Sequence, residues 1–560
     1  MTPEQTIAAL ADEMLSELLG GTPVGATLLG FHEWDDRLPD FSEAGQDARG
    51  RRLTELAARA AAVDPAALGG TDRVTRAVLR EMAQGECDQL AARAVEYTVT
   101  DTFIAPAVEL LVFLPMTELA EPAHADGYLE RLKGMPGLLD TIGERHRAGL
   151  AAGRTPVRGL VAAAVAHLDQ YLSDPGRDPL ARPDLPADLP SRDAFAAERD
   201  RLLAEAVRPA YARYRELLES AIAPHARAEE RPGLNWLPDG EAMYAGLVRA
   251  HTTTDRTPSD LHALGEELIE QLAGEYARIG ERALGVADPA EVRRRLRDDP
   301  ALRWPDGDAL LAHAKESIRR AEAAAPDWFG TVPEQRCAVV PVPESDAPGA
   351  PAAYYVSPAL DGSRPGTYFA NTHDAAQRGR AGYEAVAFHE AVPGHHFQIA
   401  RAQELGELPM LRRVNGFNAY SEGWGLYAER LADEMGLYSD DIARLGRLSE
   451  DSMRAARLVV DTGLHARGWS RDRAVEYLRA HTATPEVEIQ SEVDRYIAMP
   501  GQALAYMVGR LEIERARAAA ERALGDRFDV RAFHDTVLGS GGVPLTVLAE
   551  LVEEWAAAQR

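Results

Sequence analysis

Apolar residues recur every three or four positions along most of the chain, a spacing that places them on one face of an α-helix. Residues 1–20 show this pattern, and residues 50–230 repeat it in segments dominated by Ala, Leu, Arg and Glu, which are strong helix formers. It returns in residues 261–284, and after residue 417 it continues to residue 558. We therefore expect a mainly α-helical protein.

The pattern changes between residues 337 and 372, where short β-branched and aromatic segments are separated by turn residues. The three segments are residues 337–342, 353–358 and 367–372, and the turn residues 361–366 precede the last of them. We expect a small antiparallel sheet here. It is either simple packing or a sheet whose edge strand pairs with an extended peptide.

A chain of 560 residues exceeds the usual ~100–200 residues per domain, so we expect more than one substructure. We predict a helical N-terminal lobe over residues 1–235 and a second lobe over residues 236–560. The second lobe would hold the sheet at about 337–372, helices at about 381–435 and the C-terminal helices. The two lobes together are expected to form one continuous unit.

The charge balance restricts the partners. Lys and Arg number 61 against 89 Asp and Glu, a net charge of −28 that opposes binding to nucleic acid or to an anionic membrane surface. No apolar run approaches the ~20 residues that span a bilayer, and the acidic N-terminus lacks the basic start of a signal peptide. We expect a cytoplasmic protein without nucleic-acid or membrane partners. The oligomeric state is not predicted.

Cys87 and Cys337 are the only cysteines and lie far apart in the sequence, which excludes a disulfide framework and a thiolate metal site. A first His-Glu pair, His32 and Glu33, has no second histidine close behind it. We therefore expect it to be structural, in a polar loop around a buried Phe31 or Trp34.

The candidate chemistry lies in residues 387–398. They contain His389 and Glu390, then Pro393 and Gly394, then His395 and His396. In the HExxH signature of metallopeptidases two histidines, four positions apart on one helix, bind zinc, and the Glu is the general base. Here the position of the second histidine is occupied by proline.

Helix geometry shows what the proline changes. On an undistorted helix, His395 would lie on a different face from His389, and His396 would lie ~10 Å along the axis. Pro393 has no N–H and clashes with the carbonyl of His389, so the helix must be distorted, and Gly394 tolerates unusual dihedral angles. A break at this point would let a helix resume with His395 where the second ligand belongs.

A zinc hydrolase needs a third protein ligand and an open position for water. Glu422 lies 27 residues after His395, which leaves room for a loop and a returning helix. Gly423 and Gly425 beside it would allow close approach of backbone or substrate. Glu429, seven positions further on, is the next-best ligand, unless it is a solvated helix residue. Alternatively, these histidines and glutamates are buried polar residues with a purely structural role.

With these residues in place, the chain resembles the family called domain of unknown function 885, in the clan of thermolysin-like (gluzincin) zinc peptidases. The resemblance covers nearly the whole chain and rests on residues 29–36, 237–241, 251–254, 361–366, 389–398, 422–424, 457–465 and 500–506. It implies a helical, two-lobed, zinc-peptidase-like fold with a cleft, its small sheet beside the active-site helix. The family pattern places the second ligand directly after Pro-Gly, which selects His395 and leaves His396 as a substrate-side or packing residue.

We therefore expect one Zn²⁺ per chain, held by His389, His395 and Glu422, with Glu390 as the general base. Tyr506 or His465 is expected to stabilise the oxyanion, and Asp461 to orient the zinc site from outside it. Alternatively, Arg457, Asp461 and His465 are a structural group on one helix face. The remaining candidate substrate-binding residues are His396, Asn371, Tyr355, Gln502 and Arg510, of which Arg510 would clamp a C-terminal carboxylate.

The function that follows is hydrolysis of short peptides by a zinc-dependent peptidase. Two alternatives stay open. The same chemistry could cleave a non-peptide amide or ester, and a helical protein could bind metal without catalysis. The presence of Glu390 argues against the second alternative, because a structural metal site needs no free base.

Overall fold

A computed structural model of the chain describes residues 1–344, 347, 350–360, 362, 364–414 and 416–559. These residues form helices α1 to α23, short 3-10 and π-helical turns, and a single three-stranded sheet among the described parts. The predicted mainly α-helical fold is confirmed. No described helix is both long enough and apolar enough to cross a bilayer.

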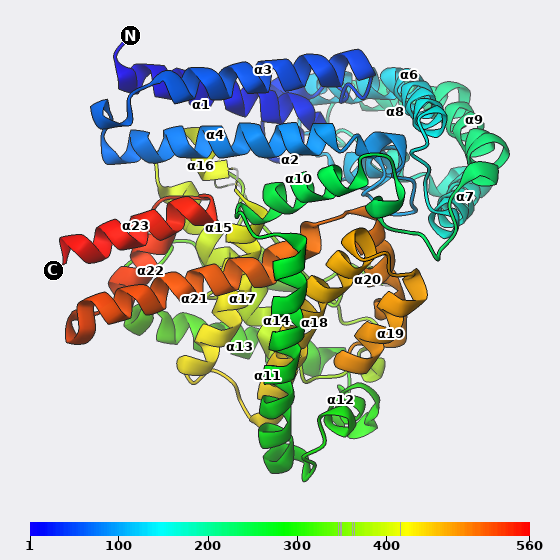
Figure 1. Ribbon diagram of the computed structural model, residues 1–560. Helices are drawn as coiled ribbons and strands as arrows, with labels where there is room; N and C mark the ends of the chain where they lie inside the picture. Colours follow the sequence, from blue (N-terminus) through cyan, green and yellow to red (C-terminus); the bar gives the residue numbers. More distant parts are fainter. Residues whose placement is uncertain (345–346, 348–349, 361, 363, 415, 560) are drawn as a thin grey trace.

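The first helices form a layer across the top of Figure 1, where α1, α3 and α4 lie side by side. This layer comprises α1 (Pro3–Gly21), α2 (Pro23–Leu28), α3 (Glu43–Ala62) and α4 (Gly70–Ala91). The predicted apolar face of α1 is buried, with Ile7, Leu10 and Met14 inaccessible to solvent. Thr2 caps α1 by accepting a hydrogen bond from the Gln5 backbone N–H, which satisfies a donor that the first helical turn leaves free.

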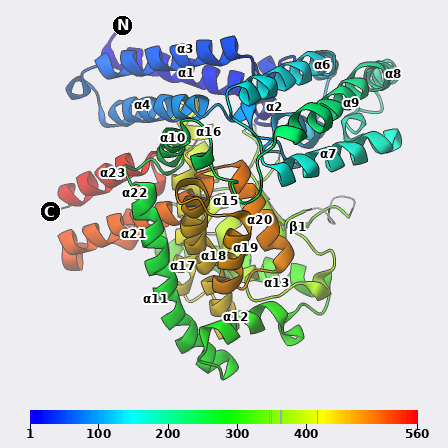
Figure 2. The same ribbon diagram turned by 45° about the vertical axis from the view of Figure 1, so that its right-hand side comes forward.

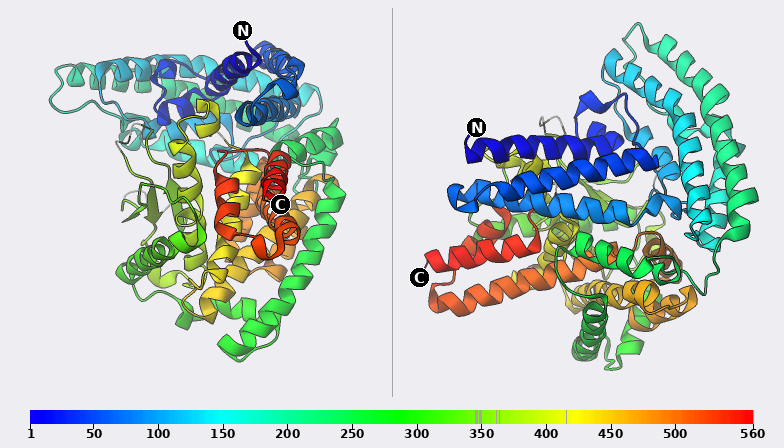
Figure 3. Two further views of the ribbon diagram at one scale, coloured as in Figure 1. Left: turned by 90° about the vertical axis from the view of Figure 1, so that its left-hand side faces the viewer. Right: turned by 45° about the horizontal axis from the view of Figure 1, so that its top comes forward.

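The next helices form an arm that extends to one side of the molecule (Figure 2) and is seen as stacked helices in Figure 3 (right). They are α5 (Pro106–Phe113), α6 (Pro122–Ala151), α7 (Arg158–Ser173), α8 (Arg192–Leu202) and α9 (Arg208–Leu217). The arm has its own apolar core, to which Leu132, Met135, Tyr211 and Ile222 contribute.

The rest of the chain forms the body. It begins with α10 (Gly240–Thr252), α11 (Pro258–Leu284), α12 (Pro289–Asp298) and α13 (Gly307–Trp328). After the sheet come α14 (Tyr383–Glu390), α15 (His395–Glu404), α16 (Met410–Val414), α17 (Asn418–Glu434) and α18 (Asp441–Ala466). The last are α19 (Arg471–His481), α20 (Glu486–Ala498), α21 (Ala505–Leu524), α22 (Val530–Leu538) and α23 (Leu545–Ala558). Two long contacts stabilise the body, one between α11 and α18 and one between α17 and α21.

The sheet is mixed, so the predicted antiparallel sheet is wrong. Strands β1 (Ala338–Pro341), β2 (Ala353–Val356) and β3 (Thr367–Ala370) are arranged in the order β1-β3-β2. β3 pairs antiparallel with β2 and parallel with β1. The third strand lies between the other two, and a hydrophobicity pattern does not encode strand order. The turn between β2 and β3 includes Asp361 and Ser363, which are outside the described residues.

The division of the apolar cores differs from the predicted lobes. Side chains of the top layer, such as Ile7, Leu53 and Val78, belong to the same core cluster as Leu247 of α10 and Leu548 of α23. The arm, residues 99–226, has a core that is largely its own. A third cluster joins Val157 and Leu160 of the arm to apolar residues of α18, α19 and α20. The predicted boundary at residue 235 therefore does not coincide with a boundary between cores.

Candidate metal centre

The centre begins where one helix ends and another starts. α14 ends at Glu390, the Val392–Pro393 peptide bond is cis, and α15 begins with His395, where the sequence predicted that a helix resumes. A side chain at Gly394 would overlap the carbonyl oxygen of His389, so only glycine fits this tight connection. The indole N–H of Trp424 on α17 donates to the Pro393 carbonyl at 2.9 Å and fixes the connection from the opposite side.

The break brings three side chains together. The Nε2 atoms of His389 and His395 lie 3.4 Å and 3.6 Å from Oε2 of Glu422. The two imidazole rings are nearly perpendicular, at 88°, with centroids 4.7 Å apart. Zinc ligands at bond lengths of about 2.1 Å in a tetrahedron are about 3.4 Å from one another, so this donor set fits a zinc ion.

A fourth side chain orients the first histidine. Nδ1 of His389 lies 2.8 Å from Oε1 of Glu429, which is completely buried. A carboxylate can only accept, so Nδ1 carries the proton, and Nε2 faces Glu422. Glu429 is thus neither the next-best ligand nor a solvated residue. Its place seven positions after Glu422, on the same helix face, is the signal that sequence reasoning underweighted.

Opposite charges stabilise this group. Burial by itself would lower the pKa of His389, but hydrogen bonds to Glu422 and Glu429 raise that pKa to about 9. Burial would raise the pKa of Glu422, yet the two histidines hold it well below its usual range. A divalent cation would replace the protons of the histidines as the partner of these carboxylates.

Glycine residues allow α17 to approach the histidines. A Cβ atom at Gly425 would lie 2.6 Å from Nε2 of His389, so any side chain there would displace the ligand atom. Gly423 lies on the opposite side of α17 and packs against the backbone of Gly509 on α21. The predicted close approach of backbone is present at Gly423, whereas at Gly425 the approaching group is the His389 side chain.

Glu390 and Tyr506 adjoin the centre. Glu390 is half-buried, and among the described residues none forms a hydrogen bond or ion pair with its carboxylate. Tyr506, in the first turn of α21, is also half-buried. Burial and then the charge of Glu422 raise the pKa of Tyr506. Tyr506 lies three residues before Gly509 on α21, and the backbone of Gly509 packs against Gly423, the neighbour of Glu422.

Two predicted residues near the end of α18 have structural partners instead. The ring nitrogens of His465 lie 3.1 Å from the Leu234 backbone nitrogen and 3.0 Å from the Tyr496 carbonyl oxygen, so its hydrogen-bonding capacity is used. Asp461 accepts hydrogen bonds from the Tyr244 hydroxyl and the Gly501 backbone N–H. The structure does not bring either residue to the candidate metal ligands.

Arg510 and Gln502 both have partners among the described residues. Arg510 is buried and donates to Asp451, a carboxylate that Arg430 and Arg447 also contact. It is not available as a carboxylate clamp. Gln502 accepts a hydrogen bond from Arg495 at 2.7 Å.

The other predicted substrate-binding residues fasten the sheet region. His396 is buried, with Nδ1 3.0 Å from the Tyr355 hydroxyl and Nε2 2.8 Å from the Gln335 carbonyl oxygen. Asn371 is buried and donates to the carbonyl oxygens of Ala347 and Ala350. His396 is therefore a packing residue that ties β2 to α15, and Asn371 holds the chain before β2.

A second group of two histidines and a carboxylate lies at the junction of the top layer and the arm. His32, Asp35 and His124 offer ligand atoms within 4.8 Å of one another, as do His389, His395 and Glu422. Asp35, not Phe31 or Trp34, is the buried residue of this loop. It accepts hydrogen bonds from Thr27 at 2.6 Å and from Nδ1 of His32 at 2.9 Å. The ring of His32 stacks on that of His124, with 3.9 Å between centroids and 11° between planes.

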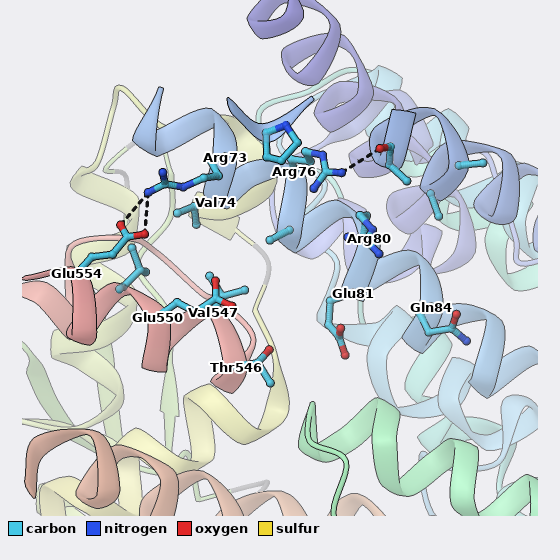
Figure 4. A pocket seen from close by; sticks show the side chains of 16 residues that line it. Arg73, Val74, Arg76, Arg80, Glu81, Gln84, Thr546, Val547, Glu550 and Glu554 are labelled. Carbon is cyan, nitrogen blue, oxygen red and sulfur yellow. Dashed lines mark hydrogen bonds and ion pairs between the residues drawn. The ribbon is translucent and has the colours of Figure 1, made fainter. Parts of the chain in front are cut away.

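A pocket of about 690 Å³ lies between α4 and α23, away from both groups (Figure 4). Two of its three arginines already have partners: Arg73 pairs with Glu554 across one end, and Arg76 donates to the carbonyl oxygens of Ala61 and Val63. None of the candidate metal ligands lines it. This pocket is therefore not the candidate centre.

Two solved structures match the full length of the chain. One, from Colwellia psychrerythraea, is described as a putative lipoprotein; it is 28% identical, covers 100% of both chains and has a TM-score of 0.90. The other, from Shewanella oneidensis, is described as a putative lipoprotein of unknown function; it is 17% identical, covers 98% of this chain and 99% of that one, and has a TM-score of 0.75.

A third structure, a putative oligoendopeptidase F from Bacillus anthracis str. Ames, is 13% identical with a TM-score of 0.30, covering 91% of this chain and 96% of that one. A likeness this weak carries no argument. No curated protein has significant sequence similarity to the chain.

These comparisons correct one prediction and establish the family. The predicted cytoplasmic location is wrong, because both full-length structural relatives are described as lipoproteins. The prediction used the lack of a bilayer-spanning apolar run and of a basic start, and neither feature reports on how relatives are located. The family described as "bacterial protein of unknown function (DUF885)" matches residues 23–552, and the chain belongs to this family.

Proposed function

We propose that the protein is a zinc-dependent peptidase that hydrolyses short peptides. The observation that carries the proposal is the convergence of His389, His395 and Glu422 directly beside Glu390, whose carboxylate has no partner among the described residues. A purely structural metal site would be closed and would need no such base.

Zinc held by the three ligands would supply a Lewis acid that polarises the scissile carbonyl and acidifies water. Glu390, at the end of α14, accepts a proton from the attacking water and gives it to the leaving amine. Glu429 keeps Nε2 of His389 directed at the ligand position throughout. The Tyr506 hydroxyl donates a hydrogen bond to the carbonyl oxygen as negative charge develops there.

The sheet provides a place for the peptide backbone. β2 is an edge strand, because β3 pairs with only one of its sides, and it contacts α14. An extended peptide that adds to the free side of β2 would run past the helix that carries His389 and Glu390.

The test replaces the proposed base. In zinc-loaded protein, Glu390→Gln should lower the cleavage of a peptide library, followed by mass spectrometry, by about 100- to 10,000-fold while one zinc per chain is retained. Glu33→Gln is the matched control, because Glu33 follows a histidine in the same way but is exposed and remote in the fold. It should cleave like the unchanged protein.

Two results would contradict the proposal in different ways. Full activity of zinc-loaded Glu390→Gln would remove Glu390 from the mechanism. A complete lack of cleavage by the unchanged zinc-loaded protein would overturn the peptidase itself.

A further inference from the structure

The environment of Arg457 on α18 contrasts with that of Arg510. Its Nε donates to the Tyr496 hydroxyl and its Nη2 to Glu492, both at 2.9 Å, and the side chain is 9% exposed. Its Nη1 is buried and has no acceptor among the described residues. In the seven other arginines with a buried, unpartnered nitrogen in the described parts of the chain, that atom is Nε, so Arg457 alone leaves a terminal nitrogen without an acceptor.

Arg457 lies beside the candidate centre. Its guanidinium lies over the ring of Tyr506, 4.6 Å from the centroid. Tyr506 in turn lies three residues before Gly509 on α21, whose backbone packs against Gly423, the neighbour of Glu422. A group bound by Arg457 would therefore be next to the tyrosine that we place at the scissile carbonyl.

The local charges leave Arg457 short of a counter-ion. Glu492 pairs with Arg457 and also with Arg495, so one carboxylate serves two guanidinium groups. Glu488, one turn earlier on α20, forms no ion pair in the described structure, and burial raises its pKa. Arg457 and Arg495 therefore share a single ion-paired carboxylate, that of Glu492.

An anionic group on the substrate would provide the partner that Nη1 of Arg457 lacks. A buried donor without an acceptor is unfavourable, and an arriving acceptor would remove that cost. A carboxylate supplies both the acceptor and the missing charge, and a guanidinium binds carboxylates through strong, charge-assisted hydrogen bonds. Every short peptide with a free C-terminus carries such a carboxylate, whatever its sequence.

We propose that Arg457 binds the C-terminal carboxylate of the substrate, so that the enzyme cleaves short peptides near their C-terminal ends. This inference rests on the proposed peptidase function and assigns its substrate class. Because the guanidinium stacks on Tyr506, the carboxylate is held at a fixed place relative to the hydroxyl that acts on the scissile bond. Arg457 thereby takes the role that the sequence suggested for Arg510.

The first experiment needs no variant. Zinc-loaded protein is given N-acetylated tetrapeptides in matched pairs that differ only in a free C-terminal carboxylate or a C-terminal amide. We expect kcat/KM to be about 100-fold higher for the free acids, the effect of pairing a buried charge. Equal cleavage of acids and amides would overturn the inference and leave the peptidase standing.

The second experiment replaces the side chain. Arg457→Leu should lower kcat/KM for the acids about 100-fold more than that for the amides, and Arg457→Lys should restore part of this difference. Arg473→Leu is the control, because Arg473 also lies over an aromatic ring, 4.2 Å from the centroid of Trp469, but is exposed. It should retain the preference for acids. An Arg457→Leu protein that folds and still prefers acids would overturn the inference.

A binding measurement separates the inference from the proposed function. Calorimetry with zinc-loaded Glu390→Gln should show tighter binding of the acid than of the amide, and adding Arg457→Leu should abolish the difference. Selective binding without any cleavage by the unchanged protein would support the carboxylate site and overturn the peptidase. If neither cleavage nor selective binding is observed, both the carboxylate site and the peptidase function are overturned.

Discussion

Two groups in this chain, His389–His395–Glu422 and His32–Asp35–His124, combine two histidines with a carboxylate and bring their ligand atoms within the same 4.8 Å. In each, one histidine is fixed through Nδ1 by a buried carboxylate: Glu429 in the first and Asp35 in the second. The difference lies in what remains. The first group still has Glu422 to face an ion, whereas Asp35 is itself the carboxylate that fixes His32.

Ring orientation separates the two groups further. The rings of His389 and His395 are nearly perpendicular, so their Nε2 lone pairs can converge beside Glu422. The rings of His32 and His124 are stacked, and a metal ion in the plane of one ring lies outside the plane of the other. Asp35 also accepts from Thr27, which Arg131 contacts. The right residue types at the right distance do not make a metal site unless the lone pairs converge and a carboxylate is left over.

Removing one histidine from each group should give the largest difference. His395→Ala should lower zinc affinity by more than roughly 1000-fold, because one of three protein ligands is lost. His124→Ala should retain one zinc per chain. Metal analysis after gel filtration measures both. Zinc retained by His395→Ala, or two ions per unchanged chain, would contradict the distinction between the groups.

The second comparison uses a glycine packed against each group. Gly425→Ala should weaken zinc binding about 100-fold, because the new Cβ would lie 2.6 Å from Nε2 of His389. Gly127→Ala would place a Cβ 2.7 Å from Cβ of Asp35, and should lower the free energy of unfolding by about 1–3 kcal/mol without changing zinc affinity. Chelator competition and thermal unfolding provide the two measurements. Equal zinc affinities of the two variants would show that α17 does not need to approach His389 closely.

The smallest expected effect concerns the two orienting carboxylates. Glu429→Gln should weaken zinc binding about 10- to 100-fold, because a charged partner of a ligating histidine is replaced by a neutral one. Asp35→Asn should leave zinc affinity unchanged and lower the free energy of unfolding by about 1–3 kcal/mol. The same chelator competition distinguishes them. A loss of zinc affinity in Asp35→Asn would indicate that the second group also binds the ion.

Local rules predicted the parts of the structure that local chemistry controls. The apolar repeat predicted over residues 261–284 lies in α11, which the Thr257 side chain caps by accepting a hydrogen bond from the Asp260 backbone N–H. Pro393 predicted the end of α14 for a reason that involves only its own ring and the preceding turn. The placement of Glu422 opposite His389 could be predicted, because it required only a loop and a returning helix.

Properties that depend on residues far away in the sequence could not be predicted in this way. Arg457 and Arg510 are both arginines on predicted helices, and only the fold shows that Asp451 neutralises Arg510. The sequence alone favours a surface position for Glu429, and only the fold shows that it is buried against His389 of α14. The order of the three strands likewise depends on contacts between segments whose hydrophobicity patterns are alike.

The shared core of the top layer and the body has a consequence for the order of folding during synthesis. The apolar faces of α1 and α4 are covered partly by α10, α16 and α23, which leave the ribosome much later. The arm buries its apolar side chains mainly against one another and can fold as soon as it emerges. The middle of the chain is therefore positioned to fold before its beginning, and the first hundred residues must wait, with apolar surface exposed, for the last helix.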